Sequence, residues 1–351
     1  MAYTTINKSA DHFNLKKYTG TGSNGNAVTG IGFQPNLIWI KDTVNAYSHR
    51  LYDSTRGVNS AISTDNNSGA SQYSAYGQLE SIDSDGFTVG QGSSSGAAMN
   101  DSGDEHISFC WKAGSSTSSN SDGDVTSTVS VNSTAGFSIV KWTNSGNAGW
   151  VGHGLGTVPH WILIKSLDSS ASSITAWVNY HHKINTSSPE DYTSYLNGTD
   201  ARIDNPVFND TAPTSTKFRF DSGDTTDYIA YCFAEKKGYS KFGRYIGSGS
   251  STQSFIYTGF RPRFIIVKCL SESDDWFMHD DLRDGYNDDN EWLFPSSSSA
   301  EGTNVNRIRL LSNGFQVPTT DKSHNKSGNE YMYIAFGQSI VGSNNVPATA
   351  R

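Results

Sequence analysis

The sequence predicts an all-β protein built of three tandem antiparallel β-sandwich repeats of jelly-roll or lectin-like type. Three observations lead to this fold class. The composition favours turns and strands, with 34 glycines, 12% aromatic residues and only 17% charged residues among 351. Apolar residues come in short runs that lack the 3.6-residue period of a helix. A segment of about 100 residues, a common size for one sandwich domain, also recurs three times.

The recurrence is clearest in a ten-residue stretch that joins a turn to an apolar run ending in lysine. It reads GFQPNLIWIK at 32–41, GTVPHWILIK at 156–165 and GFRPRFIIVK at 259–268. Each copy follows a lead-in that begins with phenylalanine. The spacing from that phenylalanine to the lysine is 28, 28 and 26 residues (13 to 41, 137 to 165 and 242 to 268). Each unit ends on a short apolar segment, HISFCWKA, DYIAYCFA or EYMYIAFG.

These landmarks divide the chain into three repeats and four connecting or terminal segments. The polar, small-residue composition between the first two repeats is typical of a flexible linker, whereas the next connection is short and charged. The expected order is an N-terminal docking arm at 1–12, repeat 1 at 13–113, a Ser/Thr/Gly linker at 114–136, repeat 2 at 137–234, a short linker at 235–241, repeat 3 at 242–338 and a C-terminal tail at 339–351.

The apolar runs predict strands. NLIWIK has consecutive apolar residues after Pro35, which indicates a strand buried on both faces or in a sandwich core. A proline cannot donate a ladder hydrogen bond, so it suits the first position of a strand and not its middle. We expect no long helix, and only 189–196 has the composition of a short helical turn.

Charge and composition exclude several classes of protein. The net charge of −8 disfavours a general nucleic-acid binder, which would be basic. No apolar run is long enough to span a bilayer, and the first residues lack the apolar core of a signal peptide. Three cysteines, an odd number, argue against a disulfide framework. We therefore expect synthesis in a cytoplasm, no membrane insertion and no nucleic-acid partner.

The best candidate site follows the opening strand of each unit, where the copies diverge. Asp53 and Arg56 in unit one match Asp280 and Arg283 in unit three. One interpretation is a polar ligand clamp, such as a sugar site with Trp276 as a stacking platform. The other, which we favour, is a structural ion pair at a strand-to-loop corner. Two more aromatic residues are candidates for glycan stacking, Trp150 and Trp292.

Metal and enzyme motifs are weak or missing. Unit two carries His181 and His182 in place of the Asp/Arg pair, but adjacent strand residues point to opposite faces, so one metal ion would rarely bind both. The acidic segment 284–291 lacks the spacing of a calcium loop. There is no nucleophile elbow, HExxH motif or P-loop. We expect no metal, no cofactor and no catalytic residue.

Long phrases of the chain resemble virion proteins of tailed bacteriophages of marine bacteria, notably cyanophages and pelagiphages. They include the opening MAYTTINKSADHFNLKKYTGTGS, VGHGLGTVPHWILIK, YIAYCFAEKKGYSKFG, YTGFRPRFIIVK and the closing NNVPATAR. The resemblance covers essentially the whole chain. It implies a structural protein on the phage particle, built of tandem β-sandwich domains, and it carries over no chemistry residue by residue.

The expected function is therefore that of a non-enzymatic virion protein of tail-fibre or appendage type that contributes to host attachment. Its expected partners are other virion proteins, a host-surface glycan and further copies of the chain. A trimer is one such assembly, and three repeats in one chain could also form a pseudo-three-fold monomer. The alternatives are a capsid or tail decoration protein and a polysaccharide-degrading tail enzyme. Binding is expected in the loops after Lys41, Lys165 and Lys268.

Overall fold

The protein is all-β. The computed structural model describes residues 4–72, 74–147, 149–169, 174–252, 254–283, 287 and 290–339. Within these residues the chain forms strands β1 to β24 and three short 3₁₀ helices, and no α-helix. All strand pairs in its sheets are antiparallel, so the coarse fold class predicted from the sequence is confirmed.

Residues 13–113, which we call unit 1, contain two antiparallel sheets. The larger sheet has the order β1-β7-β3-β4, and the smaller one has the order β2-β6-β5. The strands are β1 (Phe13–Thr19), β2 (Asn26–Thr29), β3 (Leu37–Asp42), β4 (Arg50–Asp53), β5 (Gln78–Asp83), β6 (Gly86–Gly90) and β7 (Glu105–Trp111).

Residues 137–234, called unit 2, belong to an eight-stranded sheet of order β15-β14-β13-β12-β17-β10-β9-β8 and to the two-stranded sheet β11-β16. Two of these strands, β8 and β9, lie in the segment 114–136 that was predicted to be a linker, and they extend the sheet of unit 2. The strands are β8 (Ser118–Asn120), β9 (Ser127–Asn132), β10 (Phe137–Thr143), β11 (Gly149–Gly152), β12 (Trp161–Ser166), β13 (Val178–His181), β14 (Tyr192–Tyr195), β15 (Ile203–Asp204), β16 (Lys217–Phe220) and β17 (Asp227–Phe233).

Residues 242–338, called unit 3, pair in the sheets β18-β24-β20-β21 and β19-β23-β22. Pro262 lies inside β20, not at its start as expected, and is accommodated at a register shift between Pro262 and Phe264. The strands are β18 (Ser240–Ile246), β19 (Phe255–Tyr257), β20 (Phe260–Cys269), β21 (Trp276–Asp280), β22 (Arg309–Leu311), β23 (Gly314–Gln316) and β24 (Glu330–Ser339).

The 3₁₀ helices are η1 (Ser9–Asp11), η2 (Pro189–Asp191) and η3 (Pro206–Phe208). The helical turn expected at 189–196 is thus present only over its first three residues, and β14 takes up most of the remainder. Among the described residues, no helix is long and apolar enough to cross a membrane.

One inner strand of each large sheet, β3, β12 or β20, is buried on both faces. In β3, Leu37 and Trp39 join an apolar cluster shared by the whole molecule, while Ile38 and Ile40 face the small sheet of unit 1. Strands β12 and β20 divide their residues in the same way. Successive side chains of a strand point to opposite faces, so a run of consecutive apolar residues follows directly from this double burial.

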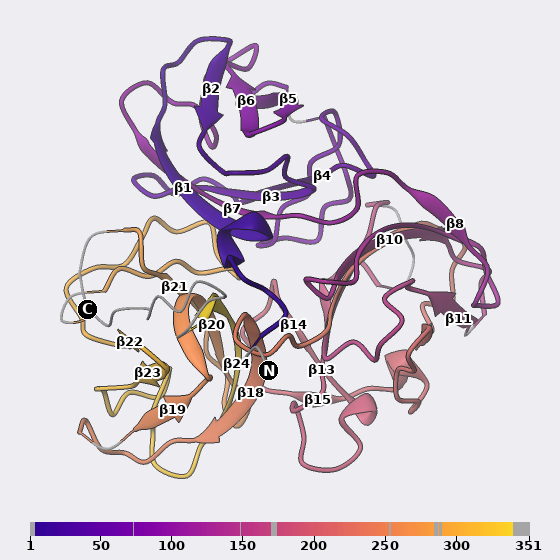
Figure 1. The fold of residues 1–351 in the computed structure, drawn as a ribbon, viewed down its shortest axis with the longest axis vertical. Coiled ribbons are helices and arrows are strands. Elements are labelled where there is room, and N and C mark those ends of the chain that lie inside the picture. The colour runs from indigo at the N-terminus through magenta and orange to yellow at the C-terminus, as the bar shows by residue number, and fades with distance from the viewer. Residues whose placement is uncertain are drawn as a thin grey trace.

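The shared cluster places three aromatic rings around the centre of the molecule. Trp111, Phe233 and Phe336 come from β7, β17 and β24, the strands that end the three units. Their ring centroids are 6.3, 5.5 and 5.7 Å apart, which closes a triangle. Figure 1 shows the three units around this centre, with unit 1 at the top, unit 2 at the right and unit 3 at the lower left. We call this triangle the aromatic hub.

Three hydrogen bonds also join each unit to the next in a closed circle. The ring N–H of Trp177 donates to Ser63 O over 2.7 Å, and that of Trp276 donates to Tyr195 O over 2.9 Å. Trp39 donates to His49 Nδ1, so the proton of His49 lies on Nε2, which donates to Phe294 O over 2.9 Å. Unit 2 thus donates to unit 1, unit 1 to unit 3 and unit 3 to unit 2.

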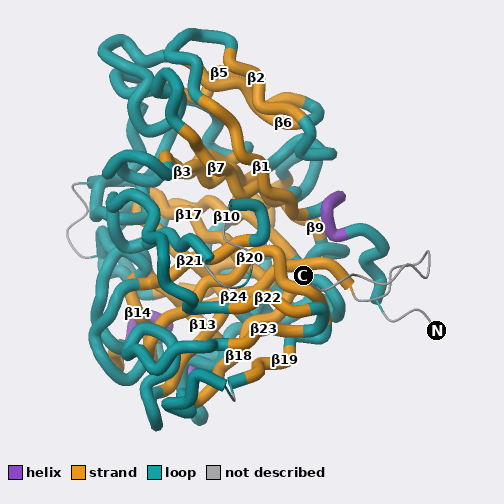
Figure 2. Tube along the Cα trace, turned by 90° about the vertical axis from the view of Figure 1, so that its left-hand side faces the viewer, coloured by secondary structure: helices purple, strands orange, loops and turns teal. Residues whose placement is uncertain are grey.

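The molecule has two different poles. Strands β1, β10 and β18 all begin near the hub, and β7, β17 and β24 return to it, because Phe13 pairs with Trp111, Phe137 with Phe233 and Ser240 with Phe336. Both connections between units therefore start and end on this side, which we call the connection pole. Helix η1 marks it at the right-hand edge of Figure 2.

The opposite side, at the left of Figure 2, is the loop pole. Strand β3 runs from Leu37, opposite Trp111, to Asp42, opposite His106, so the chain leaves the sheet away from the hub. The same holds for β12 and β20. The described residues that follow these strands form this pole, at 43–49, 167–169, 174–177 and 270–275.

The N-terminal segment packs on the molecule as far as it is described. Ile6 is buried in the shared cluster, and Ser9 N donates to the Gln338 side chain over 3.1 Å. Residues 4–12 are therefore held at the connection pole by unit 3. Residues 1–3 of the expected docking arm, and all of the expected tail after Ser339, lie outside the described residues.

Candidate functional site

Asp53 and Arg56 form a buried ion pair at the end of β4. Arg56 Nε lies 2.5 Å from Asp53 Oδ2, and Tyr231 of unit 2 donates its hydroxyl to the same oxygen over 2.8 Å. Asp53 Oδ1 accepts the backbone N–H groups of Thr55 and Arg56. Burial would lower the pKa of Arg56, but Asp53 and Tyr231 outweigh it and the pKa is raised. The pair therefore fixes a corner and links two units.

Asp280 and Arg283 repeat this geometry at the end of β21. Arg283 Nε lies 2.6 Å from Asp280 Oδ2, and Arg283 Nη1 reaches Glu301 Oε2 at 3.1 Å. Asp280 Oδ1 again accepts two backbone N–H groups. Both ion pairs have at most 2% of their side-chain surface exposed, which matches the corner interpretation and leaves little access for a ligand.

The three candidate tryptophans differ in exposure. Trp276 is fully buried and donates to Tyr195 O, so it offers no face to a sugar ring. Trp292 is 6% exposed, and the Arg307 guanidinium covers it at 4.5 Å from the ring centroid. Trp150 is half-buried on β11, with Lys217 Nζ at 5.1 Å and the Arg219 guanidinium at 5.7 Å from its ring centroid. The structure does not bring these three residues together.

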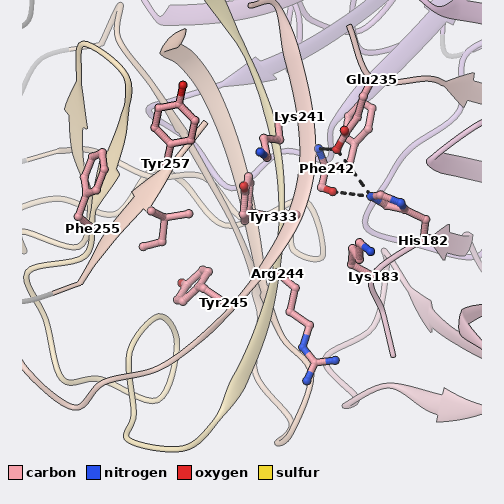
Figure 3. A pocket seen from close by; sticks show the side chains of 12 residues that line it. His182, Lys183, Glu235, Lys241, Phe242, Arg244, Tyr245, Phe255, Tyr257 and Tyr333 are labelled. Atoms are coloured by element: carbon pink, nitrogen blue, oxygen red, sulfur yellow. Dashed lines mark hydrogen bonds and ion pairs between the residues drawn. The ribbon is translucent and has the colours of Figure 1, made fainter. Parts of the chain in front are cut away.

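A cleft of about 550 Å³ opens instead on the flank between units 2 and 3. We call it the junction cleft. Figure 3 shows Phe255 and Tyr257 on one side of it and His182 and Lys183 on the other. Its volume lies in the range of ligand pockets in proteins. It is lined by His182, Lys183, Glu235, Lys241, Phe242, Gly243, Arg244, Tyr245, Phe255, Ile256, Tyr257 and Tyr333.

The cleft results from the unequal connections between the units. Strand β10, the first of unit 2, is covered along its outer edge by β9, which belongs to the long connection 114–136. Strand β18, the first of unit 3, is an edge strand of its sheet, since the connection 235–241 is too short to fold back over it. The side of β18 therefore lines the cleft from Lys241 to Tyr245.

Side chains cap this strand edge at one point. Glu235 accepts the backbone N–H of Phe242 over 2.7 Å, and His182 Nε2 lies 2.6 Å from Phe242 O. Burial would raise the pKa of Glu235, but the nearby His182, whose Nε2 lies 3.7 Å away, and the hydrogen bond from Phe242 N–H outweigh it and the pKa is lowered. Figure 3 draws these contacts as dashed lines.

Two exposed aromatic rings form the other wall. Strand β19 buries Ile256 in the small sheet and exposes its neighbours, Phe255 by 49% and Tyr257 by 53%. Lys241 Nζ lies 5.8 Å from the Tyr257 ring centroid. Gly243 forms part of the floor, where an added Cβ would lie 2.4 Å from the ring of Tyr333. The cleft thus combines apolar ring faces with charged groups.

Sequence reasoning missed the junction cleft. The FIY triplet of β19 alternates outward and inward, and two aromatic residues on a solvent face are the signal that could have found it. Of the diverging segments that follow the three lysines, that of unit 2 reaches the cleft through His182 and Lys183, and the corresponding segments of units 1 and 3 do not line it.

The three lysines themselves lie inside the protein and bind backbone groups. Lys41, Lys165 and Lys268 are fully buried, and each donates to backbone carbonyls; Lys268 donates to Thr199 O and Asp274 O over 3.0 and 2.8 Å. Burial lowers the pKa of each to about 8. The three cysteines are also buried. Across the described residues, no group of three or more His, Cys, Asp or Glu side chains is placed to hold a metal ion.

Comparison with known proteins gives one match. A family model described as a domain of unknown function, DUF7483, matches residues 8–339, which includes all three units. No curated protein matches the chain, and no solved structure does.

Proposed function

The chain belongs to the DUF7483 family, and from that premise we propose that it is a non-enzymatic structural protein of tailed bacteriophage particles. In this proposal it is exposed on the particle, as a tail fibre or appendage would be, and contributes to attachment to the host surface. It is made in the host cytoplasm and ends in the virion. The resemblance of its long phrases to virion proteins of marine phages supports this assignment.

The proposal treats units 1, 2 and 3 as tandem repeats of one β-sandwich. Two observations support it. The order β1-β7-β3-β4 recurs as β10-β17-β12-β13 and as β18-β24-β20-β21, and each central strand is buried between two layers. One chain then supplies a three-fold arrangement by itself. A jelly-roll or lectin-like type, and a homo-oligomer such as a trimer, stay predictions.

The observation that carries the functional proposal is the difference between the two poles. Both connections, helix η1 and the end of β24 lie on one side, whereas the loops after β3, β12 and β20 lie on the other. A protein that is mounted on a particle needs one surface for its virion partner and another for the outside. We assign the connection pole to the partner, and the loop pole and flanks to the outside.

Competition with particle adsorption tests this function. The purified chain is added to host cells before intact particles, and free particles are counted afterwards. The proposal expects dose-dependent inhibition of adsorption, with no release of reducing ends from host polysaccharide. Adsorption that is unchanged at saturating protein would contradict a role in attachment and favour the decoration alternative. Release of reducing ends would favour a polysaccharide-degrading enzyme.

A further inference from the structure

We propose that the junction cleft binds an acidic carbohydrate, that is, a glycan whose sugar units carry carboxylates. This inference names the ligand class for the attachment function above and rests on that function for its biological meaning. The binding itself depends only on the residues of the cleft. Nothing in the comparisons with known proteins assigns a ligand to this region.

The charge of the cleft is opposite to that of the chain. Three cationic side chains line it, Lys183, Lys241 and Arg244. Arg244 is paired with Glu330, so the charge of the cleft rests on Lys183 and Lys241 against the single lining carboxylate, that of Glu235. That carboxylate is already engaged by Phe242 N–H and lies 3.7 Å from His182 Nε2. The whole chain carries a net charge of −8, so a local cationic cleft is a feature of this site and not of the surface in general. Such a cleft attracts anions at short range.

The aromatic wall fits a sugar ring. Phe255 and Tyr257 both point outward from β19 and expose about half of their surfaces. Flat, rigid rings of this kind offer a large apolar face, and the tyrosine adds a polar hydroxyl. Lys241 lies next to the Tyr257 ring, so a sugar that stacks on this ring would bring its carboxylate within reach of the ammonium group.

The edge of β18 supplies the remaining polar contacts. The N–H and C=O of Phe242 face away from β24, as their hydrogen bonds to Glu235 and His182 show. In an antiparallel strand these directions repeat every two residues, so the N–H and C=O of Arg244 also face the cleft. One donor and one acceptor suit the hydroxyl groups of a sugar.

The same caps argue against an added peptide strand. A peptide that extends the sheet pairs with several successive residues of the edge. Here it would first have to displace both Glu235 and His182 from Phe242. The free length of edge is therefore short, and a compact ligand fits it better than an extended one.

The test compares one polymer with and without its charge. The full-length chain is titrated by calorimetry with oligomers of polygalacturonate and with the same oligomers fully methyl-esterified. The ester keeps the ring and removes the carboxylate charge. Polysialic acid and polyguluronate serve as further acidic probes. We expect binding to at least one acidic probe, weakening with salt, and an affinity of the ester about tenfold lower, since one charge-assisted hydrogen bond is lost.

Matched variants locate the site. Lys241→Gln should lower the affinity about tenfold and Tyr257→Ala roughly fivefold, for loss of the charged and stacking contacts. Tyr76→Ala is the control for the ring, because Tyr76 is also 53% exposed but lies in unit 1, and Lys112→Gln is the control for the charge. Both controls should bind as the unaltered chain does. Unchanged melting temperatures in all four variants exclude misfolding.

Several results would overturn the inference. These are equal affinity for the acid and its ester, equal losses in the control variants, no binding of any acidic probe, or competition by an oligoglutamate peptide. The attachment function is judged separately by adsorption. If the chain blocks adsorption but binds the ester as well as the acid, the ligand class proposed here is wrong and the attachment function stands.

Discussion

At the scale of single residues, buried charges are used to fix corners and to join units. Asp53 and Arg56 were predicted as an ion pair or a ligand clamp, and the structure shows how the pair is arranged. The carboxylate accepts two backbone N–H groups, the Arg56 guanidinium and the hydroxyl of Tyr231 from another unit. The sequence could predict the local pair from its spacing. It could not predict Tyr231, because that contact joins positions 178 residues apart.

Substitution Asp53→Asn should strongly destabilise the protein. It removes the charge opposite a buried guanidinium, and breaking such a pair costs about 3–5 kcal/mol. The control is Asp227→Asn, which breaks the solvent-exposed pair of Asp227 with Lys141 at 3.2 Å and should cost less than about 1 kcal/mol. Urea unfolding measures both. A cost for Asp53→Asn as small as that of the control would show that the buried pair is not a structural link.

The buried lysines predict a pH dependence. In the folded chain the pKa of Lys165 is lowered by burial from 10.5 to about 8, so between these values the unfolded chain binds more protons. Stability contributed at this site therefore rises with pH from about 8 to 10.5 and is lowest below 8. Relative to Lys165→Met, the unaltered chain should gain about 3 kcal/mol over this interval.

Urea unfolding of both proteins at several pH values from 7 to 10.5 measures this gain. The comparison between the two proteins cancels the titration of the cysteines and tyrosines that they share. The lost hydrogen bond to Thr175 O adds only a constant offset, because the neutral amine still donates. A difference that does not change with pH would contradict the assigned environment of Lys165.

At the scale of elements, the strands were predictable and their partners were not. The apolar run of NLIWIK predicted β3, and the structure confirms a strand whose six residues are all buried. Segment 114–136 was predicted as a flexible linker because it is polar and rich in small residues. Its strand β9 forms because pairing with β10 satisfies its backbone groups, and Val129 packs into the core of unit 2. Composition alone does not contain this tertiary contact.

The aromatic hub should couple the three units. Phe336→Ala removes one corner of the triangle and should cost about 3–5 kcal/mol, as in other large-to-small core substitutions. Phe255→Ala, an exposed aromatic residue of the same unit, is the control and should cost less than about 0.5 kcal/mol. Calorimetry of the unaltered chain should give one transition, and Phe336→Ala should shift it as a whole. Separate transitions for the units would show that the hub does not couple them.

At the scale of the whole molecule, the strand order β1-β7-β3-β4 has counterparts in β10-β17-β12-β13 and β18-β24-β20-β21. The recurring stretches predict the unit boundaries, and these boundaries stay a prediction. The closed ring of hydrogen bonds from Trp177, His49 and Trp276 could not be predicted, since the donor types differ between units and the acceptors are backbone carbonyls. The junction cleft was missed for a similar reason, because it depends on the length of a connection and not on a motif.

The two poles give the molecule a direction, and this direction is the basis of the proposed function. Both connections return to the hub, so the connection pole and the loop pole lie on opposite sides. The junction cleft lies between units 2 and 3 along β18 from Lys241 to Tyr245, and it borders the connection pole through Glu235.

Electron cryomicroscopy of intact particles, with this structure fitted into the density, tests the central claim most directly. The account predicts that the chain is found on the outside of the tail or its appendages, with the pole of helix η1 toward the particle and the junction cleft open to solvent. A chain that is absent from particles, or one that is mounted by its loop pole, would contradict it.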